Sequence, residues 1–159
     1  MDTIVFPGSF DPITLGHLDL IKRASKIAKK VVVVVVDTNN RLDVDVRVNL
    51  IKEAIKEIGL ENVDVDSNDD LIVEYCRRHD YHILLRGIRN NNDYQYEQVL
   101  EINNKKLFEN LETIYMFTSP EFLHISSSVV WEVLSYQDNI EHLVPSCVSA
   151  YFKEYNANL

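Results

Sequence analysis

The sequence predicts an α/β protein built on a doubly wound, five-stranded parallel sheet. Short apolar runs alternate with segments whose apolar residues recur at the helical period, a pattern typical of parallel sheets. The run Val31–Val36 is six consecutive valines, which indicates a strand covered on both faces. With 159 residues, 46% of them apolar, the chain is predicted to form a single domain over residues 1–159.

Five segments are predicted as strands because they are short and rich in β-branched, aliphatic or aromatic residues. In chain order they are Thr3–Phe6, Val31–Val36, Val63–Val65, His82–Leu85 and Thr113–Phe117. Ligands of such sheets bind at the carboxyl ends of the strands, near the point where the strand order reverses. The loops after the first, second, fourth and fifth strands are therefore the expected site.

Helices are predicted between and after these strands from the spacing of apolar residues and from capping signals. The first carries Leu18, Ile21, Ala24 and Ala28, and the second carries Leu50, Ile51, Ala54, Ile55 and Ile58 before Gly59. The third is Leu71–Arg78, capped by the acidic region Asn68-Asp69-Asp70, and the fourth is Asp93–Leu107. Two or three short helices are expected after Ser126.

Composition excludes several classes of function. The formal charge of −9, from 16 basic and 25 acidic residues, makes the chain a poor general binder of nucleic acid or anionic membranes. Cys76 and Cys147 form no CxxC pair and are expected as free thiols in a reducing compartment. We see neither a signal peptide nor an apolar run of about 18 residues, so a cytoplasmic protein is expected.

The segment after the first strand has the composition of a phosphate-binding loop. Gly8 and Gly16 allow close approach of the backbone, and Ser9 offers a hydroxyl group and an N–H to a phosphate oxygen. His17 lies in the first turn of the following helix, where unpaired N–H groups attract a polyphosphate. Taken singly, these residues would equally suit an ordinary turn and a surface histidine.

Two further strings supply phosphate-binding groups. Arg86 and Arg89 follow the fourth strand, and guanidinium groups bind phosphate in a bidentate manner. Asp93 and Glu97 are four residues apart and share a helix face. The triple serine 126–128 opens a helix, where hydroxyl and N–H groups converge, although plain capping needs only one serine.

Together these strings resemble a known family. Gly-Ser-Phe-Asp-Pro with Thr14-x-Gly-His resembles the (H/T)xGH signature of the nucleotidyltransferase superfamily. The Thr14 form, the RGxR…DYxYE string and the ISSS string are similar to bacterial phosphopantetheine adenylyltransferases. The resemblance implies a Rossmann-like nucleotidyltransferase fold with C-terminal helices. It also implies transfer of the adenylyl group of ATP to pantetheine 4′-phosphate, giving dephospho-coenzyme A and pyrophosphate, with Mg²⁺ as cofactor.

The resemblance also assigns site residues. It implies a catalytic His17 and no metal ligand from the protein. The implied ATP-binding residues are Ser9, Phe10, His17, Gly87, Ile88, Arg89, Glu97, Phe122, Leu123, His124, Ile125, Ser126, Ser127 and Ser128. The implied acceptor-binding residues are Ser9, Arg41, Ile72 and Arg86. A homohexamer and feedback binding of coenzyme A are implied in the same way.

The sequence departs from the family pattern at two places. Family members usually carry a lysine in the loop after the second strand, whereas the loop 37–47 here is about two residues shorter and offers Arg41. Trp131 stands where the family often has lysine. His79, Asp80 and His82 could suggest a metal site, but zinc requires four ligands and we do not expect one there.

Two alternatives remain open at this point. One is another nucleotidyltransferase, such as a cytidylyltransferase or a nicotinamide mononucleotide adenylyltransferase. The other is a non-catalytic nucleotide-binding module that kept the fold, which the altered loop 38–47 makes conceivable.

Overall fold

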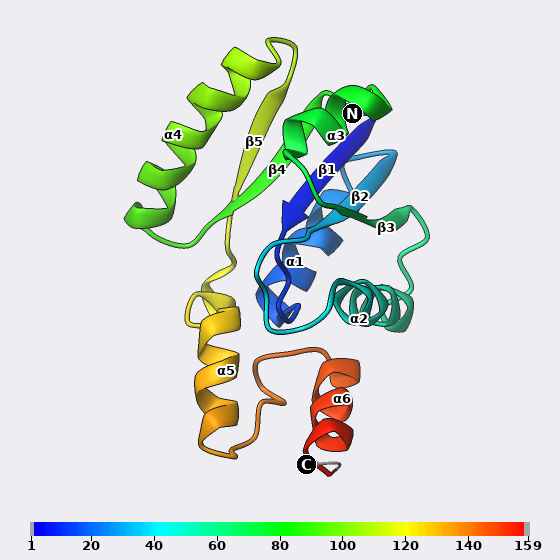
Figure 1. The fold of residues 1–159 in the computed structure, drawn as a ribbon, viewed down its shortest axis with the longest axis vertical. Coiled ribbons are helices and arrows are strands. Elements are labelled where there is room, and N and C mark those ends of the chain that lie inside the picture. Colours follow the sequence, from blue (N-terminus) through cyan, green and yellow to red (C-terminus); the bar gives the residue numbers. More distant parts are fainter. Residues whose placement is uncertain (1, 158–159) are drawn as a thin grey trace.

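The computed structural model describes residues 2–157 and contains one five-stranded sheet (Figure 1). The strands are β1 (Thr3–Gly8), β2 (Lys30–Val36), β3 (Val63–Asn68), β4 (Ile83–Ile88) and β5 (Glu112–Phe117). They lie in the order β3-β2-β1-β4-β5, and every pairing is parallel. The predicted fold class is confirmed, and all five predicted strands are present.

The helices alternate with the strands and continue past the last one. They are α1 (Leu15–Ser25), α2 (Val44–Glu57), α3 (Ile72–His79), α4 (Asn91–Leu107), α5 (Ser127–Ser135) and α6 (Ser146–Ala157). A short 3₁₀ helix, η1 (Pro120–Phe122), lies between β5 and α5. None of the helices within residues 2–157 is long and apolar enough to cross a membrane.

The valine run of β2 is buried on both faces of the sheet, as its composition predicts. Val31, Val33 and Val35 belong to the larger core cluster, with residues of α1, α2, α5 and α6. Val32 and Val34 point to the other face and belong to a second cluster with residues of α3. This alternation explains why β2 needs apolar side chains at consecutive positions.

The order of the strands places the site. Successive strands run outward from β1 through β2 to β3, and the chain then returns to add β4 on the other side of β1. The strand order therefore reverses between β1 and β4, and the loops that follow these two strands meet at one edge of the sheet. In Figure 1, α5 and α6 lie at one end of the molecule, and α4 stands beside β4 and β5.

The cap predicted for the third helix is wrong. The N-cap of α3 is Leu71, whose side chain makes no capping hydrogen bond. The polar residues before it are used otherwise: Asn68 donates to the carbonyl oxygen of Asp70, and Arg78 forms an ion pair with the Asp70 carboxylate. The acidic region ties the start of α3 to its last turn instead of capping its first N–H groups.

Candidate active site

The loop after β1 brings His17 into the wall of a cavity of about 380 Å³. Thr14 is the N-cap of α1 and His17 is its third residue. The Thr14 hydroxyl oxygen accepts the backbone N–H of His17 at 3.3 Å, and the backbone N–H of Thr14 donates to Nδ1 of His17 at 3.1 Å. This reciprocal capping box fixes the imidazole ring against the start of the helix.

The capping box also determines the protonation of His17. Because Nδ1 accepts a backbone N–H, the proton of the neutral ring lies on Nε2. Burial of the ring, with a contribution from the nearby Arg89 guanidinium, lowers the pKa of His17 to about 4. The ring is therefore neutral near pH 7 and keeps an Nε2–H that has no acceptor among residues 2–157.

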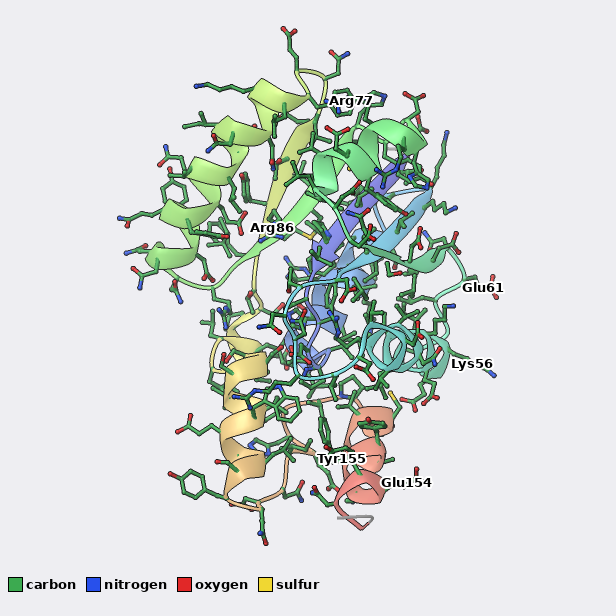
Figure 2. The ribbon with its side chains drawn as sticks, viewed as in Figure 1. Lys56, Glu61, Arg77, Arg86, Glu154 and Tyr155 are labelled. Carbon is green, nitrogen blue, oxygen red and sulfur yellow. The ribbon has the colours of Figure 1, made fainter. Side chains whose placement is uncertain are left out.

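Arg86 lies in the second half of β4 (Figure 2), and a carboxylate from α4 holds it. Its Nε lies 2.9 Å and 3.0 Å from the two carboxylate oxygens of Glu97, and its Nη2 lies 2.7 Å from Oε1. Nη1 donates to the carbonyl oxygen of Pro7 at 3.2 Å. Glu97 is only 6% exposed, although it is a carboxylate. The pair leaves part of the Arg86 guanidinium facing the cavity, with its orientation fixed.

Arg89 is held in the same manner by the next carboxylate of α4. The Asp93 carboxylate accepts the backbone N–H of Arg89 at 3.0 Å and its Nε at 3.2 Å. Nη1 of Arg89 also donates to the carbonyl oxygen of Ile125 at 3.4 Å. Arg89 thereby connects the loop after β4 to the segment that opens α5.

Two of the three serines at the start of α5 make different hydrogen bonds. Ser126 is the N-cap and accepts the backbone N–H of Val129 at 3.2 Å. Ser127 donates its hydroxyl hydrogen to the carbonyl oxygen of Pro12 at 2.9 Å, which ties α5 to the loop after β1. Only one serine is needed as a cap, and all three line the cavity.

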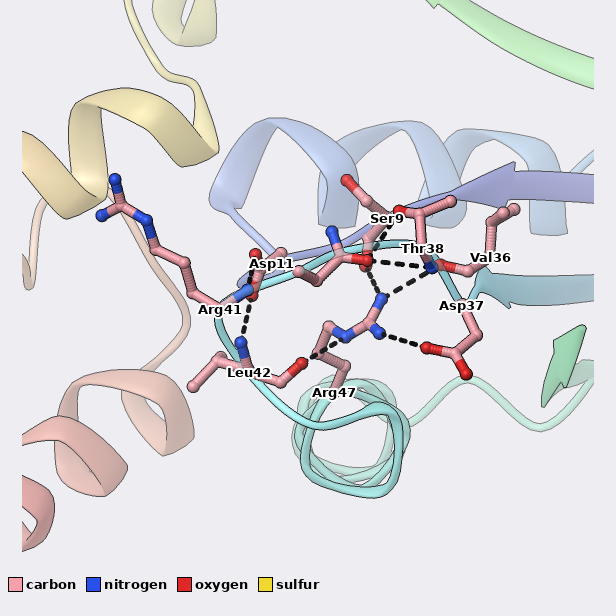
Figure 3. A network of polar contacts seen from close by, with 9 residues as sticks. Ser9, Asp11, Val36, Asp37, Thr38, Arg41, Leu42 and Arg47 are labelled. Carbon is pink, nitrogen blue, oxygen red and sulfur yellow. Dashed lines mark hydrogen bonds and ion pairs between the residues drawn. The ribbon is translucent and has the colours of Figure 1, made fainter. Parts of the chain in front are cut away.

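A buried arginine joins the loops after β1 and β2 (Figure 3). Arg47 is 1% exposed, and its guanidinium donates to the carbonyl oxygens of Leu42, Ser9 and Val36 at 2.9, 2.8 and 3.1 Å. Asp37 forms an ion pair with it at 3.3 Å. Arg47 was not predicted as part of the site, although it lies on the apolar stripe of α2, where a cation indicates a buried network.

Comparison with known proteins identifies the family. The model of the cytidylyltransferase-like family matches residues 5–133, which include His17, Arg86, Arg89 and the three serines. The chain belongs to the cytidylyltransferase-like family. The predicted nucleotidyltransferase superfamily is thereby confirmed, and the phosphopantetheine branch stays a prediction.

One solved structure has the same fold as this member of the cytidylyltransferase-like family. It is described as a candidate nicotinate-nucleotide adenylyltransferase from Vibrio parahaemolyticus. The TM-score is 0.71 at 19% sequence identity, and the match covers 94% of this chain and 90% of that chain. A likeness at this identity establishes the shared nucleotidyltransferase fold.

Most site residues predicted from sequence line one cavity in this cytidylyltransferase-like protein. They are Ser9, Phe10, His17, Arg86, Gly87, Arg89, Glu97, Ile125, Ser126, Ser127 and Ser128. The side chain of Phe10 is 1% exposed and packs edge-to-face on the rings of Phe6 and His17, so Phe10 supports the loop from below. Asp93, Tyr96 and Thr118 also line the cavity, and no role in binding was predicted for them from the sequence.

Other predicted residues lie outside this lining. Ile88 is buried in the core, and Leu123 and His124 are exposed on the segment before α5. Phe122 lies in η1, beside Gly16. A Cβ atom built onto Gly16 would lie 3.7 Å from the Cβ atom of Phe122. Ile72 packs against the second core cluster, and Arg41 lines a neighbouring cavity.

The cavity presents donors and positive charge to a ligand. Its two carboxylates on α4 are each paired with an arginine, and its hydroxyl and N–H groups come from the starts of α1 and α5. Burial raises the pKa of Cys76 to about 12 and that of Cys147 to about 11, so both thiols are protonated near pH 7. The arrangement of the cavity suits binding and charge stabilisation of a polyphosphate.

Proposed function

We propose that the protein transfers the adenylyl group of ATP to pantetheine 4′-phosphate, as a phosphopantetheine adenylyltransferase. One observation carries the adenylyl transfer: a neutral His17 keeps an Nε2–H that has no acceptor among residues 2–157, in a cavity that Arg86, Arg89 and the serines of α5 also line. The choice of acceptor rests on the sequence strings, namely Thr14-x-Gly-His, RGxR and ISSS.

The reaction is a direct displacement at phosphorus. An oxygen of the acceptor's 4′-phosphate attacks the α-phosphorus of ATP and forms the new P–O bond. The bond from the α-phosphorus to the oxygen bridging toward the β-phosphorus breaks, and its electron pair leaves with pyrophosphate. The acceptor phosphate is already ionised near pH 7, so no general base is required.

The residues of the cavity have the following roles in this proposal. His17 donates Nε2–H to an α-phosphate oxygen as negative charge accumulates there. Arg86 holds the acceptor phosphate, and Glu97 fixes the orientation of that guanidinium. Arg89 and the start of α5 bind the phosphates of ATP. Catalysis then consists of orientation and charge stabilisation, and orientation alone can contribute about 7–11 kcal/mol.

Mg²⁺ fits this site as a companion of ATP rather than as an ion held by the protein. Asp93 and Glu97 are already paired with arginines, and the Asp11 carboxylate accepts two backbone N–H groups. Within residues 2–157 no group of three His, Cys, Asp or Glu side chains could hold a metal. Mg²⁺ commonly binds substrate phosphates, whose charge it would neutralise here.

We also infer that the protein self-associates through α4 and β5 into the homohexamer that the family resemblance implies. Large apolar side chains are exposed on this part of the molecule. They are Tyr94, Tyr96, Val99, Ile102, Leu107, Tyr115 and Phe117, with Phe117 at 78% exposure. An apolar surface of this kind is covered when subunits assemble.

Coenzyme A contains the adenylylated skeleton of the product, and we expect it to compete with the substrates.

The structural neighbour favours a second candidate, transfer of the adenylyl group to nicotinate mononucleotide. Pyrophosphate release with ATP should therefore be measured against pantetheine 4′-phosphate, nicotinate mononucleotide and nicotinamide mononucleotide, and with CTP in place of ATP. We expect turnover with ATP and pantetheine 4′-phosphate. Turnover with a mononucleotide instead would identify that mononucleotide as the acceptor, and comparable use of CTP would overturn the preference for ATP. No turnover at all would favour a binding module.

A further inference from the structure

A second cavity, of about 460 Å³, adjoins the catalytic cavity. Ser9, Ser127 and Ser128 line both cavities. Arg41 and Trp131 line only the second cavity, whereas Arg86 and Glu97 line only the first. Arg41 and Arg86 therefore approach the shared serines from different sides.

Arg41, from the loop after β2, and Trp131, from α5, meet in this second cavity. The Cζ atom of Arg41 lies 4.9 Å from the centre of the Trp131 ring, which is the geometry of a cation–π contact. In Figure 3 the Arg41 side chain extends from the loop after β2 toward α5. Arg41 of the loop after β2 and Trp131 of α5 thus form one structural unit.

Asp11 holds both members of this unit in place. Its carboxylate accepts the backbone N–H of Arg41 and that of Leu42, both at 2.9 Å. Its carbonyl oxygen accepts Nε1–H of Trp131 at 2.7 Å. Phe152 packs edge-to-face against the indole ring at 5.3 Å. The tryptophan is thereby fixed, and a fixed ring restricts the guanidinium stacked on it.

Arg41 differs from the other arginines around the two cavities because its charge is not neutralised. Arg47, Arg86 and Arg89 each form an ion pair with a carboxylate. The Arg41 guanidinium forms none with any residue between 2 and 157, although the exposed Glu132 also lines the second cavity. A fully charged guanidinium that stacks on Trp131 at the edge of the cavity is suited to bind a strongly anionic group.

The geometry of displacement decides which anion this is. In an in-line reaction the attacking oxygen and the leaving oxygen lie on opposite sides of the α-phosphorus. In this proposal Arg86 holds the attacking phosphate in the first cavity. Ser127 and Ser128 open α5, which binds the phosphates of ATP, and they line both cavities, so the end of ATP that faces away from Arg86 lies toward Arg41. We propose that Trp131 is a positioning residue that holds Arg41 beside the leaving pyrophosphate, an inference that rests on the proposed adenylyl transfer. Arg41 then contacts the pyrophosphate end of ATP, and not the acceptor.

A direct test uses the protein's single tryptophan as the reporter. Fluorescence excited at wavelengths that tyrosine does not absorb comes from Trp131 alone. Titration of the native protein with inorganic pyrophosphate should give a saturable change, because the ligand alters the cation stacked on the ring. Arg41→Ala should abolish this change, and Glu132→Gln, which leaves the stack intact, should preserve it. A native protein whose fluorescence does not respond would overturn the inference.

Calorimetry with inorganic pyrophosphate extends the test to variants of the tryptophan. Loss of a charged contact corresponds to a weakening of about 10- to 100-fold, which we expect for Arg41→Ala. Trp131→Ala should weaken binding similarly, and the double variant should be no weaker than Arg41→Ala. Trp131→Phe keeps an aromatic face and should retain most of the affinity, even though it loses the bond to Asp11. Unchanged affinity in Trp131→Ala would show that the tryptophan does not position Arg41.

Kinetics separates this inference from the proposed function. In an active enzyme, Arg41→Ala and Trp131→Ala should raise the inhibition constant for pyrophosphate and leave the KM of the acceptor unchanged. A raised acceptor KM with unchanged pyrophosphate inhibition would overturn the inference while the transferase function stands. If the native protein shows no turnover with any acceptor, the proposed function fails, and the pyrophosphate titrations still decide whether Arg41 and Trp131 form an anion site.

Discussion

Glu97 and Arg86 form a closed pair, in which both carboxylate oxygens of Glu97 contact the guanidinium at 2.7–3.0 Å. The sequence predicted separate roles for these residues, with Arg86 on the acceptor and Glu97 on ATP. A carboxylate that is 6% exposed and fully engaged with Arg86 acts on a ligand mainly through that arginine. The two residues should therefore behave as one functional unit.

The first prediction concerns this unit. Arg86→Ala and Glu97→Ala should both raise the acceptor KM more than the ATP KM, and the double variant should be little worse than either single variant. Glu97→Ala should also lower the free energy of unfolding by about 3 kcal/mol, because it leaves a partly buried charge unpaired. Kinetics with each substrate varied separately, and urea unfolding, measure both effects. Glu101→Ala, on the same helix, is the control. Additive losses in the double variant, or a rise in the ATP KM alone in Glu97→Ala, would show that the two residues have separate roles.

Much of the fold could be predicted because it depends on local patterns. Five of the six valines of β2 alternate between two faces that are both covered, and so a run of one residue type was enough to identify a central strand. Thr14 and His17 are three residues apart, and the motif that contains them also forms the local capping box. Contacts between residues that are close in sequence can be predicted from the motif that contains them.

What could not be predicted depends on contacts between distant segments. Arg47 contacts the carbonyl oxygen of Ser9, 38 residues away, and Arg41 meets Trp131 across the second cavity. The charge state of His17 was open from sequence, because dipole and phosphate effects oppose each other there. The structure shows burial as the main cause of its lowered pKa, with Arg89 as the second. Burial is a property of the assembled cavity and has no signature in the motif.

The second prediction tests the buried network around Arg47. Arg47→Met should lower the free energy of unfolding by about 3–5 kcal/mol, because it leaves three carbonyl oxygens and Asp37 without their donor. Arg47→Lys keeps the charge but cannot reach all these acceptors, so an intermediate loss is expected. Urea unfolding followed by circular dichroism measures the loss. Arg41→Met is the matched control on the neighbouring exposed arginine, and an equal loss in that variant would contradict the prediction.

The third prediction follows from the pKa of His17. The folded-state pKa, about 4, lies below the ordinary value of 6.5, so between these values the unfolded chain binds more protons than the folded one. The stability that His17 contributes is therefore fully present above about pH 6.5 and is lost as the pH falls toward about 4. Native protein should lose more stability than His17→Gln between about pH 7 and about pH 5, by urea unfolding. Equal losses in the two proteins would mean that His17 titrates normally.

The same pKa predicts the pH dependence of the reaction. If the neutral ring is the working form, kcat should not fall through a step near the ordinary histidine value of 6.5, because His17 remains neutral down to about 4. Steady-state rates in overlapping buffers measure this profile with ATP and acceptor both saturating. The acceptor phosphate itself gains a proton near its second pKa of about 6. A loss of kcat near the ordinary histidine value that exceeds this effect would show that the bound phosphates restore a normal pKa to His17.

The last prediction tests the assigned catalytic role of His17. The Nε2–H of a ring fixed by the Thr14 capping box is already oriented before the substrate binds, and it should act mainly on charge that develops in the transition state. His17→Ala should therefore lower kcat by about 100- to 1000-fold, or about 2.7–4 kcal/mol, while ATP binding measured by calorimetry changes only a few-fold. Thr14→Ala provides the control, because it removes the hydroxyl group, which accepts the His17 N–H and lies 3.1 Å from Nδ1, but leaves the backbone N–H that holds Nδ1. That variant should lose about 1 kcal/mol of stability and keep most of its kcat. If His17→Ala instead kept its kcat and lost affinity for ATP, His17 would be a binding residue, and the reaction would proceed without a catalytic side chain at this position.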